Sequence, residues 1–183
     1  AILFMAKHSQ EPAKLEEFFS HLERLAAIQM LLRATINQRI ERYGRVLAAI
    51  ENGDDLFAEN SPIQLSSDEQ TRTIEALNGD IYGLLPKLRM YVLLRLDSAL
   101  SGGGATYEHD LITVEHVLPQ NPSPNSQWES WFPDPTYRVD IVHQLGNLAL
   151  LTRRKNSSAG NYEFEKKKHS YFTKGGVSPF AIT

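Results

Sequence analysis

Apolar residues recur at helical spacing through the first part of the chain. Leu15, Phe18, Leu22 and Leu25 follow one another at intervals of three and four positions, with charged residues between them. This pattern predicts an amphipathic helix that buries one broad face. Pro12 fits its first turn, because a proline's missing N–H needs no helical partner there.

Three more helices are expected before position 101. The second covers residues 38–51, with Asn37 as its possible cap, and ends at the Asn-Gly-Asp-Asp run at 52–55. The third begins at Ser66 or Ser67, either of which can cap it, and ends near position 77. The fourth covers 81–100, with Pro86 in its first turn. The Ser-Gly-Gly-Gly run at 101–104 is expected to be a flexible joint, so the predicted domains are a helical scaffold at 1–104 and a second domain at 105–183.

The pattern changes after this joint. A β-prone run at 111–114 leads into Glu115 and His116, and a second short strand is expected at 148–152. The prolines at 119, 122 and 124 predict a long loop between the strands, in which Trp128 and Trp131 are expected to be core residues rather than base-stacking platforms. A helix is expected over residues 161–172. The predicted fold class is therefore α+β, with a helical scaffold followed by strand, loop, strand and helix.

Composition narrows the chemistry. Of 183 residues, 42% are hydrophobic, which is enough for a buried core, and none is cysteine. The lack of cysteine excludes disulfides and thiolate zinc sites and agrees with a reducing cytoplasm. Any metal must be held by oxygen or imidazole ligands, which favours Mg²⁺ or Mn²⁺. No apolar run reaches the roughly 20 residues of a membrane span, and no membrane partner is expected. The opening AILFMAKH resembles part of a buried helix, so the chain is expected to be a fragment.

The net charge of −3 argues against nucleic-acid binding over the whole surface. Residues 150–174 are nevertheless basic, which is compatible with a local phosphate-binding surface. The candidate DNA contacts there are Arg153, Arg154, Lys155, Lys166 and Lys167. A solvated helix face is the ordinary interpretation of the lysine run at 166–168. The chain contains no phosphate loop of the G-x-x-x-x-G-K type, and no nucleotide binding is assigned to it.

Four residues are candidates for chemistry. Glu115 and His116 adjoin on the first strand, where neighbouring side chains point to opposite faces unless the strand ends or bends. Asn147 opens the second strand, and Asn156 follows nine positions later. A hairpin packed on the last helix could bring the four together. Asn147 could instead serve a turn and Asn156 a helix cap. His143 is expected to pack or to form a hydrogen bond rather than to bind a metal.

The segment EHVLPQN at 115–121, followed by LGNLALLTRRKNSSAGNYEFEKKKHSYF at 145–172, resembles a known nuclease domain. It is similar to the C-terminal HNH domain of GmrSD-type modification-dependent restriction enzymes and of SspE-type phosphorothioation-linked phage-defence nucleases. The helical segment FFSHLERLAAIQMLLRATINQRIERYGRVL resembles the stretch that precedes the nuclease in these proteins. The resemblance implies a ββα-metal fold (HNH, His-Me finger) for residues 105–183.

The same resemblance implies residue roles. His116 would be the general base that activates water, with a pKa near its ordinary value of about 6.5. Glu115 would take the place of the acidic metal ligand, which is usually Asp, and Asn156 would complete the metal site. Asn147 would steady the loop and the base. One metal and one base would cut one strand per event, so nicking is expected, with double-strand breaks arising from paired nicks.

The expected function is thus Mg²⁺- or Mn²⁺-dependent nicking of double-stranded DNA in restriction or anti-phage defence. A nucleotide-hydrolysing, modification-sensing domain of the same protein is expected as a partner, N-terminal to this chain. Two alternatives stay open at this point. One is a catalytically weak DNA-binding or interaction module with a vestigial HNH core, and the other is a ribonuclease that uses the same site.

Overall fold

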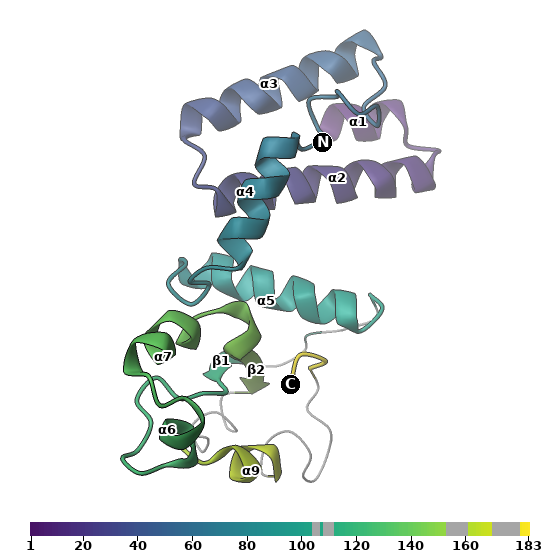
Figure 1. Ribbon diagram of the computed structural model, residues 1–183. Coiled ribbons are helices and arrows are strands. Elements are labelled where there is room, and N and C mark those ends of the chain that lie inside the picture. Colours follow the sequence, from purple (N-terminus) through teal and green to yellow (C-terminus); the bar gives the residue numbers. More distant parts are fainter. Residues whose placement is uncertain (104–106, 108–111, 153–160, 170–179) are drawn as a thin grey trace. The chain divides into compact units, whose positions relative to one another are not determined.

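The computed structural model describes residues 1–103, 107, 112–152, 161–169 and 180–183 (Figure 1). Helices and one small antiparallel sheet make up these residues, so the α+β class is confirmed at that level. The chain divides into two compact units, Ala1–Ala76 and Leu77–Thr183.

The first unit is helical. It contains α1 (Ile2–Lys7), α2 (Pro12–Leu31), α3 (Ile36–Asn52) and α4 (Ser67–Leu77). Helix α3 begins earlier than the sequence pattern suggested, because Thr35 and Gln38 form a reciprocal cap in which each side chain accepts a hydrogen bond from the other's backbone N–H. Gly53, with a φ of 78°, ends the same helix in the left-handed conformation that glycine adopts at little cost.

The core of this unit lies between α1, α2 and α3. Helices α2 and α3 run alongside each other (Figure 1). Phe4 stacks on Phe18 with ring centroids 4.0 Å apart. The buried core residues are Phe4, Phe18, Leu25, Val46, Ala49, Ile50, Leu56 and Ile63. The predicted apolar face of α2 is therefore the face that supplies this core.

The second unit is built around two strands. Strand β1 (Ile112–His116) pairs antiparallel with β2 (Leu148–Thr152), and the register places His116 opposite Leu148. Helix α5 (Pro86–Leu100) contributes Leu93 to the core that Leu148 and Leu150 also enter. Four of the five residues of β2 are buried. The sheet is therefore stabilised by the packing of α5 as well as by its own hydrogen bonds.

The segment between the strands corrects the expectation of a long loop. It contains α6 (Gln127–Trp131), α7 (Pro135–Val142) and the short 3₁₀ helix η1 (Leu145–Asn147). Ser126 caps α6 and Asp134 caps α7, each through its side-chain oxygen. Trp128 is only 3% exposed, as expected of a core residue, whereas Trp131 is 51% exposed.

The last described helix is α9 (Phe164–Lys167), inside the range predicted as helical. It lies beside α6 (Figure 1), and the ring centroids of Trp128 and Phe164 are 6.0 Å apart. The order strand, strand, helix thus agrees with the expected order of elements. Residues 153–160, which contain Arg153, Arg154, Lys155 and Asn156, lie outside the described residues.

Candidate functional site

Glu115 and His116 stand at the C-terminal end of β1, and each is 7% exposed. Neighbouring side chains on a strand point to opposite faces. Glu115 accordingly contacts Lys167 of α9, whereas His116 contacts His143, which follows α7. The end of β1 therefore holds two polar clusters, one beneath each face of the hairpin.

The His116 ring is held at both of its nitrogens. Its Nδ1 lies 3.3 Å from the side-chain nitrogen of Gln120, and its Nε2 lies 3.1 Å from Nδ1 of His143. Because the amide nitrogen of Gln120 can only donate, Nδ1 of His116 is the acceptor in this arrangement. The proton of the neutral His116 ring then sits on Nε2 and is donated to His143. The available lone pair of His116 is on Nδ1.

The electrostatics of His116 differ from the expectation. Burial lowers the pKa of its imidazole to about 4. The charge of His143 in its protonated form, and the charges of Lys167 and Arg89, lower this pKa further, whereas Asp80 raises it. The expected pKa near 6.5 is therefore corrected, because desolvation disfavours the charged form of a buried base. His116 is neutral at physiological pH, the state in which an imidazole can take up a proton.

Tyr82 packs against both histidines. Its ring is stacked on His143 with centroids 5.0 Å apart and meets His116 edge to face at 4.3 Å. The guanidinium carbon of Arg89 lies 4.0 Å from the centroid of the Tyr82 ring. The backbone N–H groups of Ile81 and Tyr82 both donate to the carbonyl of His143. The segment before α5 thus fixes the position of His143, and through it that of His116.

Glu115 forms a buried ion pair with Lys167. The Lys167 ammonium donates to Oε1 of Glu115 at 2.7 Å and to the backbone carbonyls of His116 at 2.7 Å and Val117 at 3.1 Å. Burial raises the pKa of the Glu115 carboxyl, and the hydrogen bond and charge of Lys167 act against that rise. Lys167 is 1% exposed, so in this arrangement its ammonium anchors α9 to β1 and does not reach a phosphate.

Asn147 fastens the two ends of the hairpin together. Its side-chain oxygen accepts from the N–H of Leu118 at 2.7 Å, and its amide nitrogen donates to the carbonyls of Leu118 and Val142 at 3.0 and 2.8 Å. Its own carbonyl accepts from the N–H of Val117. These bonds fix the path of the chain immediately after His116.

A divalent metal ion does not fit the described residues by themselves. Within the described ranges, no three His, Asp or Glu side chains gather as a cation site. Oε1 of Glu115 is bound to an ammonium group, and a positive charge at that place opposes a second cation. Asn156, the other expected ligand, lies outside the described residues.

Two residues of the site were not foreseen as functional. Sequence reasoning gave His143 only a general packing or hydrogen-bonding role, and it did not single out Gln120. The separation of 27 positions between His116 and His143 carries no periodic signal. Gln120 does lie four positions after His116, within the EHVLPQN segment, so its place in that segment was the available signal.

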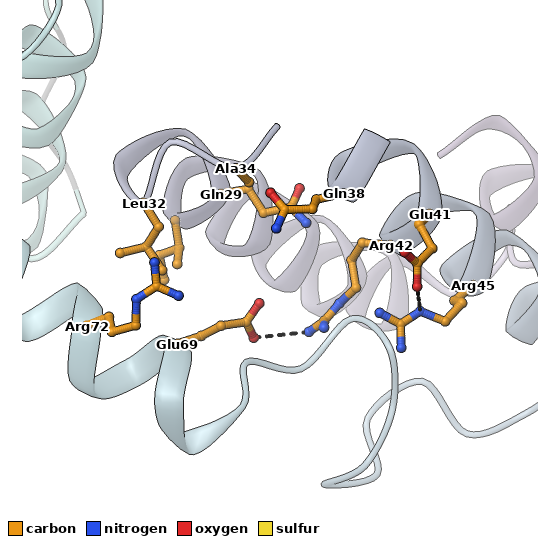
Figure 2. Close-up of a pocket in the computed structure, with 10 residues that line it drawn as sticks. Gln29, Leu32, Ala34, Gln38, Glu41, Arg42, Arg45, Glu69 and Arg72 are labelled. Atoms are coloured by element: carbon orange, nitrogen blue, oxygen red, sulfur yellow. Dashed lines mark hydrogen bonds and ion pairs between the residues drawn. The ribbon is translucent and has the colours of Figure 1, made fainter. Parts of the chain in front are cut away.

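A polar pocket in the first unit is a weaker candidate. Figure 2 shows Arg42 directed at Glu69 and Arg45 directed at Glu41, with nitrogen–oxygen distances of 3.2 and 4.0 Å. Arg42 also donates to the backbone carbonyls of Pro62 and Gln64. Carboxylates balance much of the positive charge of this pocket, and its lining contains no histidine. The end of β1 is therefore the better candidate for acid–base chemistry.

The match to a protein family settles the broader identity. The model of the GmrSD restriction endonuclease C-terminal domain matches residues 65–183, more than half of the chain. The chain belongs to this family. The match includes α5, both strands and α9, so the GmrSD-type domain holds every residue of the two polar clusters. Membership makes it a nuclease domain of the restriction type, with DNA as its substrate.

Other comparisons add no second relative. A search of the curated proteins and a search of the solved structures each found no match to the chain. Across the described part of this GmrSD-type chain, no helix has the length and apolar character needed to cross a lipid bilayer.

Proposed function

We propose that the domain nicks double-stranded DNA by hydrolysis, with His116 as the general base. The observation that carries this proposal is the position of His116: a neutral, buried imidazole at the end of β1, held through Nε2 so that Nδ1 keeps its lone pair. A nuclease that cuts by hydrolysis needs a base to activate the attacking water. The described part of the domain contains no better placed base than His116.

The proposed reaction begins when a water molecule replaces the Gln120 amide at Nδ1 of His116. The water oxygen attacks the phosphorus of a phosphodiester while one of its protons passes to Nδ1. The bond from phosphorus to the 3′ oxygen breaks, and that oxygen takes a proton from solvent. The products are a 5′-phosphate and a 3′-hydroxyl. The negative phosphate raises the low pKa of His116 toward neutrality, which makes the ring a stronger base when DNA is bound.

His143 acts in this scheme as a positioning residue. Its Nδ1 accepts the Nε2 proton of His116 at 3.1 Å. As His116 gains its second proton, this bond becomes a charge-assisted hydrogen bond and strengthens. His143 therefore stabilises the protonated ring and fixes its orientation. The Tyr82 ring stacked on His143 excludes water from the other side of the pair.

We propose dependence on Mg²⁺ or Mn²⁺ separately from the role of His116 as general base. When bound, such an ion would neutralise charge on the phosphate and on the departing oxygen. The proposed ligands remain Glu115 and Asn156. Because Oε1 of Glu115 is bound to Lys167, coordination through that oxygen would require the ion pair to open. The proposed DNA contacts are Arg153, Arg154, Lys155 and Lys166, of which Lys166 is described and exposed.

The test is conversion of supercoiled plasmid by the chain and its His116→Ala variant. The unaltered chain should produce open circles before linear DNA, with Mg²⁺ or Mn²⁺ present and not with EDTA. His116→Ala should lose about a hundredfold or more of this rate, within the range for loss of a general base. His169→Ala is the matched control, because His169 is exposed and pairs only with Glu165 among the described residues.

Each result has a distinct meaning. Undiminished nicking by His116→Ala, with circular dichroism showing an intact fold, would remove His116 from the mechanism. Activity that persists in EDTA would contradict the metal proposal and leave the base in place. Faster cleavage of an RNA duplex than of a DNA duplex of equal length would contradict the assignment of double-stranded DNA as substrate.

A further inference from the structure

An aromatic cavity adjoins the candidate site in the second unit. Its volume is about 430 Å³, within the range of ligand sites. Its aromatic lining consists of Trp128, Trp131, Phe132, Tyr137 and Phe164. The Trp131 ring meets those of Trp128 and Phe164 edge to face, with centroids 5.5 and 6.3 Å away. The walls come from α6, α7 and α9, three elements separated in sequence.

Part of this lining is left uncovered. Trp131 is 51% exposed and Tyr137 is 52% exposed, although both line the cavity. Trp128 differs, because its ring is buried and its indole N–H donates to the carbonyl of Tyr162 at 3.0 Å. Exposed aromatic surface that converges on a cavity is typical of a binding site rather than of a completed core.

The opposite wall belongs to the candidate active site. Val117 and Leu118, the two residues that follow His116, line the cavity together with Asn147. Gln144 also lines it, and its side-chain amide makes no hydrogen bond to another described residue. The cavity thus combines apolar ring faces with Gln144, and part of its wall is the segment that directly follows the candidate base.

We propose that this cavity accepts one unstacked nucleobase of the DNA substrate, from a nucleotide next to the phosphate that is cut. Trp131 and Tyr137 stack on the base, and the Gln144 amide forms a hydrogen bond with its edge. Enzymes that extrude a base hold it between aromatic or apolar side chains and read its edge through hydrogen bonds. Aromatic side chains stack on any base, so the stacking tolerates different sequences.

Charge favours a nucleotide over an apolar peptide as the occupant. Helix α9 supplies Phe164 to the cavity and the exposed Lys166 two positions later. The Lys166 ammonium lies 3.4 Å from the centroid of the Tyr162 ring, at the surface of the same helix. Because residues two positions apart on a helix do not face each other, Lys166 can bind a DNA phosphate near the cavity but not inside it. The inference rests on the proposed function only in taking DNA as the substrate.

The experiment measures DNA binding without cleavage. The chain carrying His116→Ala is titrated with a short matched duplex and with the same duplex containing one mismatched pair. A mismatched base is easier to extrude, so the mismatched duplex should bind about tenfold more tightly. Trp131→Ala should remove this preference and weaken binding about tenfold or more. Val139→Ala is the control, because Val139 is an exposed apolar residue of α7 that does not line the cavity.

Fluorescence provides a second readout, since the chain has only two tryptophans. Stacking of a base on Trp131 should quench the fluorescence of this residue, and the Trp131→Phe variant should lack that quenching. Gln144→Ala should weaken the preference for the mismatched duplex without abolishing the quenching. The inference would be overturned if the Trp131→Ala variant and its parent bound both duplexes with equal affinity. It would also be overturned if DNA left the tryptophan fluorescence unchanged. An apolar peptide as the true occupant would give that same result. If DNA binding proved independent of Trp131 while nicking still required His116, the inference would fail and the proposed function would stand. If nicking did not require His116 but DNA binding required Trp131, the proposed function would fail and the inference would stand.

Discussion

One contact between two imidazoles determines what His116 can do. The bond from Nε2 of His116 to Nδ1 of His143 leaves Nδ1 of His116 as the acceptor, and the stack of Tyr82 keeps His143 in place. A hydrogen bond to a group that becomes charged is worth about 1.5–3 kcal/mol. A change at His143 should therefore affect the rate of reaction more than the affinity for DNA.

We expect His143→Leu to lower kcat about tenfold to about a hundredfold, with KM nearly unchanged, because the protonated His116 ring loses its acceptor. His143→Asn should recover much of the rate, since its side-chain oxygen can occupy the place of Nδ1. Steady-state plasmid nicking measures both constants. Equal loss in the two variants, or a loss confined to KM, would show that His143 serves the fold and not the base.

The sequence predicted which residues lie at the candidate site better than it predicted which residues they contact. Its adjacent Glu and His were expected at the end of a strand, and they lie there. The partner of Glu115 was not predictable, because Lys167 is 52 positions away within a lysine run that resembles a solvated surface. Which of three neighbouring lysines turns inward depends on how α9 meets the hairpin, and that is a tertiary property.

Helix α9 has little support of its own. Four residues make a helix far too short to be stable alone, so tertiary contacts must hold it. The buried Lys167 supplies three of them, to Glu115 and to the carbonyls of His116 and Val117. Lys167 therefore ties this helix directly to the end of β1.

Lys167→Met should destabilise the second unit by about 3–5 kcal/mol, because it leaves a buried carboxylate without a partner. Lys166→Met is the matched control: the same substitution one position earlier, on an exposed side chain, should cost less than about 1 kcal/mol. Urea unfolding gives both values. The double variant Glu115→Leu, Lys167→Met should cost less than the sum of its single changes. Equal effects of the two lysine substitutions would contradict the ion pair.

The longer helices with periodic faces and recognisable caps were predicted, and the short helices between the two strands were not. Ser66 does begin α4, since its hydroxyl accepts from the N–H of Glu69. The prolines predict a loop where α6 and α7 lie, although Ser126 and the Asp134–Pro135 pair are cap signals. Segments of five and eight residues offer too little periodicity to outweigh several prolines, and their stability comes from packing.

The whole molecule divides into two compact units, and the division does not lie at the Ser-Gly-Gly-Gly run at 101–104. The compact units divide between Ala76 and Leu77, because Leu93 of α5 shares a core with Leu148 and Leu150. The boundary expected near position 104 remains a prediction about domains. An amphipathic helix shows in its sequence that one face is buried, but not which partner buries it.

We expect a core substitution in the first unit to act locally. Phe18→Ala removes a fully buried ring and should lower the stability of the helical unit by about 3–5 kcal/mol. Amide hydrogen exchange should then accelerate in α2 and α3, while β1 and β2 keep their protection. Equal acceleration in both units would show that the chain unfolds as one cooperative body.

The Tyr82 stack also gives the site a built-in spectroscopic label. Circulating electrons of an aromatic ring shift the magnetic resonance of protons that lie above its face or beyond its edge. Tyr82 presents its face to one imidazole and meets the other at a steep angle, so the carbon-bound protons of His143 and His116 should resonate away from those of the exposed His169. Arrival of DNA at the hairpin could therefore be followed through these two signals without a dye or a chemical tag.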